Sequence, residues 1–476
     1  MPLRTLVKRP PVTCPPGESV AAASRTMAAH GVGSIVVLGP DGTPAGIVTD
    51  RDLRERALAA GRSPETPVAG IMSSPVVTLS PEALVFEALL EMTRRDIHHL
   101  VLLEDRRVAG VVSSHDLLLV HAAAPLEVAR RLQSCATVAE LTETMPALTE
   151  TTRALFEQGI SGYEIGRILS ELNDAVIRRV LGFVEQELRA GGAGEPCVPY
   201  CWVVLGSEGR REQTLHTDQD NALVYEDPSP PLRQPAERYF HGLADRAIAG
   251  LIALGYPPCP GGAMASNPKW CQPLAVWRRY FADWVREPAS ENLLYASIYF
   301  DLRPVAGAER LARALREEIR TQVAAWRSFP RHLAKIAVSH APPLGLFSRF
   351  RVERREGRRG INVKLNAMLL LVNALRAYAI DLGLDETNTI ERLEAATRAG
   401  GCFTRPEAID IRDAYETIAR FRLRHQLARI AAGHAPDNLL DPYALGRTEQ
   451  RQLKEAFRTV RRLQGKVADR YFTEAL

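Results

Sequence analysis

The N-terminal quarter of the chain contains an internal repeat, so this part must form the same folding unit twice. Residues 46–53 recur as residues 110–117, an offset of 64, with glycine, two apolar residues, a hydroxyl residue and an aspartate at matching places. Upstream, residues 12–13 and 35–38 recur as 77–78 and 100–103, an offset of 65. Each unit predicts the order strand, helix, short strand, turn, strand, helix, with residues 19–30 and 81–94 as the first helices.

The repeated signature resembles that of cystathionine-beta-synthase (CBS) modules, which occur in pseudo-symmetric pairs. In that family the hydroxyl residue and the aspartate approach the phosphates and ribose of an adenine nucleotide. The resemblance therefore implies that Thr49, Asp52, Ser113 and Asp116 bind a regulatory ligand such as AMP or ATP, and that the modules form a homodimer. Helix capping is the alternative for all four side chains, because a hydroxyl or carboxylate beside a helix start can satisfy its free amides.

A Gly-Ser turn lies in the middle of the chain, at Gly206 and Ser207. Residues 200–205 before it are apolar and predict a buried strand. Residues 208–215 after it are expected to open a helix whose N-terminal amides, together with Arg210 or Arg211, would face a phosphate.

Two carboxylates follow, since Asp218 and Asp220 stand at i and i+2, beginning eleven residues after Ser207. On a strand this spacing directs both side chains to one face. Mg²⁺ prefers oxygen ligands and is commonly shared with substrate phosphates. The pattern predicts a site that holds a nucleoside triphosphate on magnesium, although an isolated Asp-x-Asp is more often a solvated turn.

These motifs, Gly206-Ser207, Gly209-Arg210-x-Glu212 and Asp218-x-Asp220, resemble those of the polymerase-beta-like nucleotidyltransferases, in particular the bacterial uridylyl- and adenylyltransferases of nitrogen regulation. Those enzymes need a third carboxylate. The best candidate is Asp301, in residues 297–304, which predict an apolar strand ending in an Asp-x-Arg-Pro run. Over nearly the whole chain the sequence is similar to bacterial proteins of the DUF294 type, which join such a domain to paired CBS modules.

The resemblance implies roles for six residues of the central region. Asp218, Asp220 and Asp301 would be catalytic and would bind two Mg²⁺ ions. Gly206, Ser207 and Arg210 would bind the phosphates of the nucleotide.

Helices are predicted on both sides of this region. Apolar residues recur at three- and four-residue intervals through residues 125–190, a candidate coupling arm, and from residue 309 to the C-terminus. Trp270, Trp277 and Trp284 are typical of a buried helix seam rather than a base-stacking platform. The basic segment 349–360 is either a solvated connector or an anion-binding or docking segment, and Lys364 beyond it could reach a triphosphate.

Composition excludes several classes of protein. The 60 basic and 56 acidic residues nearly cancel, and the formal net charge of +4 does not favour nucleic acid as a partner. No apolar run approaches the ~20 residues of a membrane span, and the first residues do not lead into a signal-peptide core, so we expect a cytoplasmic protein. The seven scattered cysteines are expected to be reduced, and His98-His99 is expected to pack in a strand.

We therefore predict an α+β multidomain protein in four segments. A CBS pair spans residues 1–122, with units of about 1–62 and 63–122, and a helical arm spans 123–194. A nucleotidyltransferase domain with a mixed sheet spans 195–308, and a helical domain spans 309–476. The expected function is transfer of a nucleoside monophosphate from a nucleoside triphosphate to a protein or small molecule, under nucleotide control; the alternative is a non-catalytic nucleotide sensor that presents its helical domain to a partner.

Overall fold

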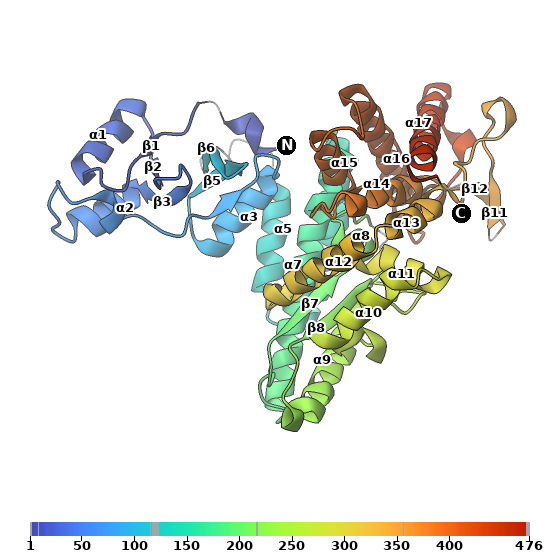
Figure 1. The fold of residues 1–476 in the computed structure, drawn as a ribbon, viewed down its shortest axis with the longest axis horizontal. Coiled ribbons are helices and arrows are strands. Elements are labelled where there is room, and N and C mark those ends of the chain that lie inside the picture. The colour runs from blue at the N-terminus through green and yellow to red at the C-terminus, as the bar shows by residue number, and fades with distance from the viewer. Residues whose placement is uncertain are drawn as a thin grey trace. The chain divides into compact units, whose positions relative to one another are not determined.

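A computed structural model describes residues 2–7, 9–114, 116, 123–215, 218–355 and 357–472 (Figure 1). The chain forms two compact units, Met1–Arg130 and Arg131–Leu476.

The first unit contains two three-stranded sheets of the same topology, β1-β2-β3 and β4-β5-β6. The elements of the first repeat are β1 (Thr13–Cys14), α1 (Val20–His30), β2 (Ser34–Leu38), β3 (Pro44–Thr49), α2 (Asp50–Asp52) and the helical segment η2 (Leu53–Leu58). Those of the second are β4 (Thr78–Leu79), α3 (Val85–Arg95), β5 (His99–Glu104) and β6 (Arg107–Ser113). Short helical turns lie at η1 (Leu3–Leu6) and η3 (Val68–Gly70).

Strand register confirms the internal repeat. Thr13 pairs with Val36 in the first sheet, and Thr78 pairs with Val101 in the second, which are the positions expected from the 65-residue offset. Both sheets also carry an irregularity at the same place, after Val37 and after Leu102. The helix expected after Ser113 falls largely on residues 117–122, outside the described residues.

The first helix of each repeat begins at a cap. Ser19 accepts a hydrogen bond from the amide of Ala22 and starts α1, in agreement with the sequence. Helix α3 begins at Val85, four residues later than predicted, because the Glu87 carboxylate accepts a hydrogen bond from the Leu84 amide and fixes the start there.

The second unit is built on a four-stranded sheet of order β10-β7-β8-β9. Its strands are β7 (Tyr200–Val204), β8 (Asn221–Tyr225), β9 (Cys271–Pro273) and β10 (Arg303–Gly307). Helix α5 (Ala123–Ser134) spans the boundary between the two units in the sequence. The helices of the second unit before and around the sheet are α6 (Val138–Glu157), α7 (Gly162–Ala190), α8 (Gly206–Gly209), α9 (Arg233–Ala253), α10 (Leu274–Arg286), α11 (Ser290–Tyr299) and α12 (Glu309–Ala325), with short turns η4 (Pro230–Leu232) and η5 (Pro268–Trp270).

Helices cover both faces of this sheet (Figure 1). Strand β7 is buried along its whole length, as its continuous apolar sequence predicts. Cys201 and Val203 pack into the core that also contains residues of α10 and α12, whereas Tyr200 contacts Phe240 of α9. The alternation of side chains along β7 thus serves two helical layers.

The C-terminal part is helical, with one small sheet, β11-β12-β13. Its helices are α13 (Phe329–Val338), η7 (Lys364–Met368), α14 (Leu369–Asp381), α15 (Thr389–Arg398), α16 (Arg405–Ala431) and α17 (Arg447–Tyr471), with turns η6 (Leu346–Ser348) and η8 (Pro442–Ala444). The basic segment forms a hairpin of β11 (Glu353–Arg355) and β12 (Arg358–Asn362), which pairs with β13 (Leu439–Leu440). Among the described helices, none has the length and apolar character needed to cross a bilayer.

Other expectations have clear outcomes. Trp270, Trp277 and Trp284 are buried in one aromatic cluster, as predicted, although Trp270 precedes the helix that carries the other two. All seven cysteines are free thiols. The arm predicted as helical throughout consists of α5, α6 and α7, and Gly191 caps its end.

Two predicted elements of the central region are wrong. Residues 208–215 do not open a helix: α8 is a single turn that ends at Gly209, and Arg211 beyond it has a φ of 55°, in the left-handed region. Residues 297–304 are not one strand, because α11 continues to Tyr299 and β10 begins only at Arg303. Short apolar runs fit a helix and a strand equally well, which explains the second error.

Candidate functional site

The Gly-Ser turn packs directly against the second carboxylate of the central motif. Gly206 has a φ of 53°, and a Cβ atom there would lie 2.6 Å from an Asp220 carboxylate oxygen, so only glycine fits. The amide of Leu205 donates a 2.8 Å hydrogen bond to the carbonyl of Asp220. The turn and the acidic segment therefore hold each other in place.

Asp218 and Asp220 lie just before β8. Gln219 between them is fixed on both sides, since its amide donates to the Pro257 carbonyl and its side chain to the Tyr256 carbonyl. Burial raises the pKa of Asp220, as does the charge of Asp218, and the Cys259 thiol and the Lys364 ammonium oppose this shift. Two carboxylates thus share one electrostatic environment.

This pair fits a magnesium ion that is also held by substrate phosphates, because Mg²⁺ in such sites takes only one or two protein carboxylates. The pair already has a cationic neighbour: Lys364 Nζ lies 3.5 Å from Asp218 Oδ2. Within the described residues, however, no group of three or more His, Cys, Asp or Glu side chains is arranged to hold a metal. The described residues therefore fit one magnesium ion, held by the carboxylates of Asp218 and Asp220.

Asp301, the expected third metal ligand, is instead enclosed by arginines. It is completely buried, and its two carboxylate oxygens accept hydrogen bonds from Arg210, Arg376 and Arg392 at 2.6 to 3.2 Å. Burial alone would raise the pKa of Asp301, but these three guanidinium groups hold it below its usual range. In this structure Asp301 joins the nucleotidyltransferase region to α14 and α15, and it does not join Asp218 and Asp220.

Arg210, which was expected to bind phosphate, belongs to this group of arginines around Asp301. Its guanidinium contacts Asp301 at 2.7 Å and Glu212 at 2.8 Å, and the residue is buried. Glu212 in turn accepts a 2.7 Å hydrogen bond from the amide of Thr389 at the start of α15. The charge of Arg210 is therefore paired with carboxylates, although Arg210 lines the same cavity as Ser207, which was also expected to bind phosphate.

Glu208 is a carboxylate that the sequence reasoning missed. It is 4% exposed; one oxygen accepts a 2.9 Å hydrogen bond from Gln213, and the other is buried without a partner among the described residues. Burial, followed by the charges of Asp220 and Asp174, raises its pKa well above the usual value. Its position directly after the Gly-Ser turn was the sequence feature from which Glu208 could have been identified as a site residue.

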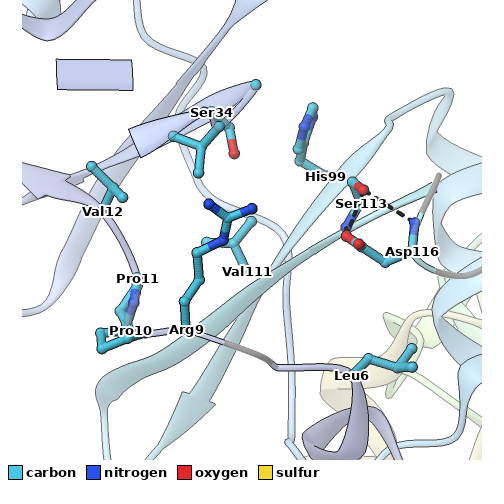
Figure 2. Close-up of a pocket in the computed structure, with 13 residues that line it drawn as sticks. Leu6, Arg9, Pro10, Pro11, Val12, Ser34, His99, Val111, Ser113 and Asp116 are labelled. Atoms are coloured by element: carbon cyan, nitrogen blue, oxygen red, sulfur yellow. Dashed lines mark hydrogen bonds between the residues drawn. The ribbon is translucent and has the colours of Figure 1, made fainter. Parts of the chain in front are cut away.

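The second repeat of the first unit carries the other candidate site (Figure 2). Ser113 donates a 2.6 Å hydrogen bond from its hydroxyl and a 2.9 Å bond from its amide to Asp116 Oδ2. Both residues line a cavity of about 260 Å³, together with Arg9 and His99. Burial lowers the pKa of His99. A cationic side chain, a hydroxyl and a carboxylate thus meet in one cavity.

The first repeat forms the same cap but closes it. Thr49 donates to Asp52 Oδ2 from its hydroxyl at 2.7 Å and from its amide at 2.9 Å. The other oxygen, Oδ1, lies 3.3 Å from both Arg56 and the Ser73 hydroxyl, and Asp52 is 6% exposed. The matching position to Arg56 in the second repeat is Val120, so the sequence itself distinguishes the two caps.

Three family models match successive parts of the chain. The family described as "CBS domain" matches residues 3–59 and 68–122, "Putative nucleotidyltransferase DUF294" matches 146–291, and "Putative nucleotidyltransferase substrate binding domain" matches 327–471. The chain therefore belongs to the CBS-domain proteins, and within them to those that carry a nucleotidyltransferase-like domain of the DUF294 type and its C-terminal domain.

Individual relatives are shorter matches. "Uncharacterized protein MK0525" of Methanopyrus kandleri is 32% identical over 117 residues, which are 24% of this chain and 60% of that protein. "CBS domain-containing protein YhcV" of Bacillus subtilis is 32% identical over 105 residues, which are 22% of this chain and 74% of the relative. Among solved structures, the CBS domain protein PAE2072 from Pyrobaculum aerophilum complexed with AMP has 29% identity and a TM-score of 0.25, over 27% of this chain and 99% of that one.

Proposed function

We propose that the protein is a signal-transducing nucleotidyltransferase that moves a nucleoside monophosphate from a nucleoside triphosphate to a hydroxyl group of a protein or small molecule. The observation that carries this proposal is the contact between Gly206 and Asp220, which places a Gly-Ser turn against a carboxylate pair. Membership of the DUF294 type supports it.

In the proposed reaction, the acceptor oxygen forms a bond to the α-phosphorus while the bond from that phosphorus to the bridging β-oxygen breaks. Pyrophosphate leaves, and the hydroxyl proton passes to solvent. The chemistry that Mg²⁺ supplies when bound at the pair is neutralisation of charge on the phosphates. Asp218 and Asp220 would hold the ion, and the tight turn at Gly206 would let the backbone approach the phosphates closely.

The regulatory part of the proposal concerns the first unit. Adenine nucleotide would bind in the cavity at Ser113 and Asp116, where Asp116 can accept hydrogen bonds from ribose hydroxyls and Arg9 can pair with phosphate. We propose that residues 1–122 sense this ligand, 123–194 couple it to residues 195–308, which transfer, and 309–476 complete the substrate site. Pairing of the CBS modules would make the protein a homodimer.

A second candidate function rests on Asp301. Its carboxylate is held by three arginines, and among the described residues no group of three His, Cys, Asp or Glu side chains is arranged to hold a metal. This favours a sensor that binds nucleotide without transferring it and presents the helical domain to a partner.

Labelling separates the two functions. The full-length protein is incubated with each α-³²P-labelled nucleoside triphosphate, Mg²⁺ and a cell lysate, with and without AMP or ATP. Transfer by the wild type that is lost in Asp220→Asn supports the enzyme. Nucleotide binding that depends on Asp220, without label on any acceptor, supports the sensor, and labelling that persists in Asp220→Asn rejects the proposed site.

A further inference from the structure

A small cavity of about 60 Å³ lies beside the Gly-Ser turn, within the second unit. Ser207 and Thr214 border it from the nucleotidyltransferase region, Lys364 from η7, and Tyr415 and Arg422 from α16. The rest of the wall consists of small residues such as Gly166 and Ala419, of the polar side chains of Arg210, Glu212 and Gln213, and of the apolar side chains of Leu365, Met368, Leu369 and Val372. The cavity is therefore formed jointly by the region that holds the acid pair and by the C-terminal helices.

Arg422 is the unusual member of this lining. The described part of the chain buries five arginines, and four of them, Arg167, Arg210, Arg376 and Arg392, pair with a carboxylate. Arg422 is 5% exposed; its Nε donates a 2.7 Å hydrogen bond to the Asn438 amide oxygen, and no carboxylate of a described residue lies within ion-pair distance. A buried cation without an anion is costly to the fold.

The surroundings of Arg422 suit an anion shared with the acid pair. Burial lowers the pKa of Arg422 to about 10, and Asp218 is among the charges that act on it. Lys364, which contacts Asp218, borders the same cavity. Tyr415 lies seven residues before Arg422, on the same face of α16, and the hydroxyls of Tyr415 and Ser207 add neutral donors.

We propose that this cavity binds the terminal phosphoryl group of the nucleoside triphosphate, with Arg422 as its buried cation and Lys364 as its second. This inference rests on the proposed function and extends it by assigning a phosphate subsite to the C-terminal helices. The volume corresponds to roughly two water molecules, which suits one phosphoryl group. Guanidinium is the side chain best matched to two phosphate oxygens.

Pyrophosphate binding tests the subsite directly. Isothermal titration of the full-length protein, without divalent metal, compares the wild type with Arg422→Gln and with Arg420→Gln, an exposed arginine of the same helix. Arg422→Gln should weaken binding by about tenfold or more, the cost of losing a charge-assisted contact, and Arg420→Gln should change it little. Equal affinity in Arg422→Gln, or no binding by the wild type, overturns the proposal.

Stability supplies a second readout. Because no described carboxylate pairs with Arg422, Arg422→Gln should melt at the same temperature as the wild type or higher. Pyrophosphate should raise the Tm of the wild type and of Arg420→Gln but not of Arg422→Gln. Arg422→Lys should partly restore the shift. A large fall in Tm for Arg422→Gln without ligand, together with an unchanged pyrophosphate shift, would show a structural role.

Two further measurements distinguish the phosphate subsite from a site for a phosphorylated acceptor, and the subsite from the transferase function. If inorganic phosphate still binds at Arg422 when the protein is saturated with a non-hydrolysable triphosphate, the phosphoryl group belongs to a phosphorylated acceptor and the proposal is wrong. If pyrophosphate binding depends on Arg422 but no acceptor is labelled under any condition, the phosphate subsite stands and the transferase function fails.

Discussion

The ammonium nitrogen of Lys364 lies 3.5 Å from Oδ2 of Asp218, so a C-terminal residue supplies positive charge to the acid pair. A divalent ion would compete with this ammonium for the same carboxylate. The arriving phosphates would in turn offer Lys364 a new anionic partner.

Replacing this lysine should therefore change two affinities in opposite directions. In Lys364→Gln, Mn²⁺ without nucleotide should bind a few-fold more tightly, since a partly exposed ion pair is worth at most about 1 kcal/mol, whereas triphosphate should bind more weakly. Electron paramagnetic resonance measures free Mn²⁺. Arg359→Gln, an exposed charge change nearby in sequence, is the control. A fall in both affinities would contradict the competition.

Glu208 should make stability depend on pH. Because the pKa of Glu208 is raised in the folded state, the folded protein keeps a proton that the unfolded chain loses above about pH 4.3. The wild type therefore loses stability as the pH rises from the pKa of Glu208 in the unfolded chain to its pKa in the folded protein. Glu208→Gln should be similar to the wild type near pH 4 and more stable by about 1 kcal/mol or more near pH 8. Urea unfolding at several pH values measures this, with the exposed Glu287→Gln as control.

Neutralising Asp301 should lower stability, whereas neutralising Asp218 should weaken nucleotide binding. Asp301→Asn leaves three buried guanidinium groups short of an anion and should lower the free energy of unfolding by about 3 to 5 kcal/mol, with or without Mg²⁺. Asp218→Asn should retain its stability and lose Mg²⁺-dependent nucleotide binding. An Asp301→Asn protein that is fully stable yet cannot bind Mg²⁺ would restore Asp301 as a metal ligand.

The two repeats should differ in ligand binding. The Asp52 cap is closed by Arg56 and Ser73, whereas Asp116 lines a cavity, so the first unit should bind one molecule of AMP per chain. Calorimetric titration should give that stoichiometry, abolished in Asp116→Ala and retained in Asp52→Asn. Two equivalent ligands per chain would rule out the asymmetry.

The fold was largely predictable because its signals are local. The CBS repeat is readable from two offsets, and the buried strand from the run Tyr200–Val204. The surroundings of Asp301 were not predictable, because Arg376 and Arg392 stand 75 and 91 residues away along the chain. Only packing of α14 and α15 brings their charges to one carboxylate.

The same reason explains the missed residues of the site. Glu208 acquires its altered pKa from burial and from Asp174, which lies on a helix far earlier in the chain. Arg422 cannot be distinguished from other helical arginines by sequence, because only the structure shows that no described carboxylate lies within ion-pair distance of it. Asp218 and Asp220 were predictable as a pair, because their spacing is itself the signal.

The aromatic cluster around Trp270 gives the molecule a built-in optical reporter. All five tryptophans, Trp202, Trp270, Trp277, Trp284 and Trp326, lie in the second unit, and the CBS repeats contain none. Intrinsic fluorescence therefore observes the nucleotidyltransferase and C-terminal regions alone, whereas circular dichroism observes the whole chain. A nucleotide bound between the repeats that alters tryptophan emission would reveal, without any label, that its binding reaches the other unit.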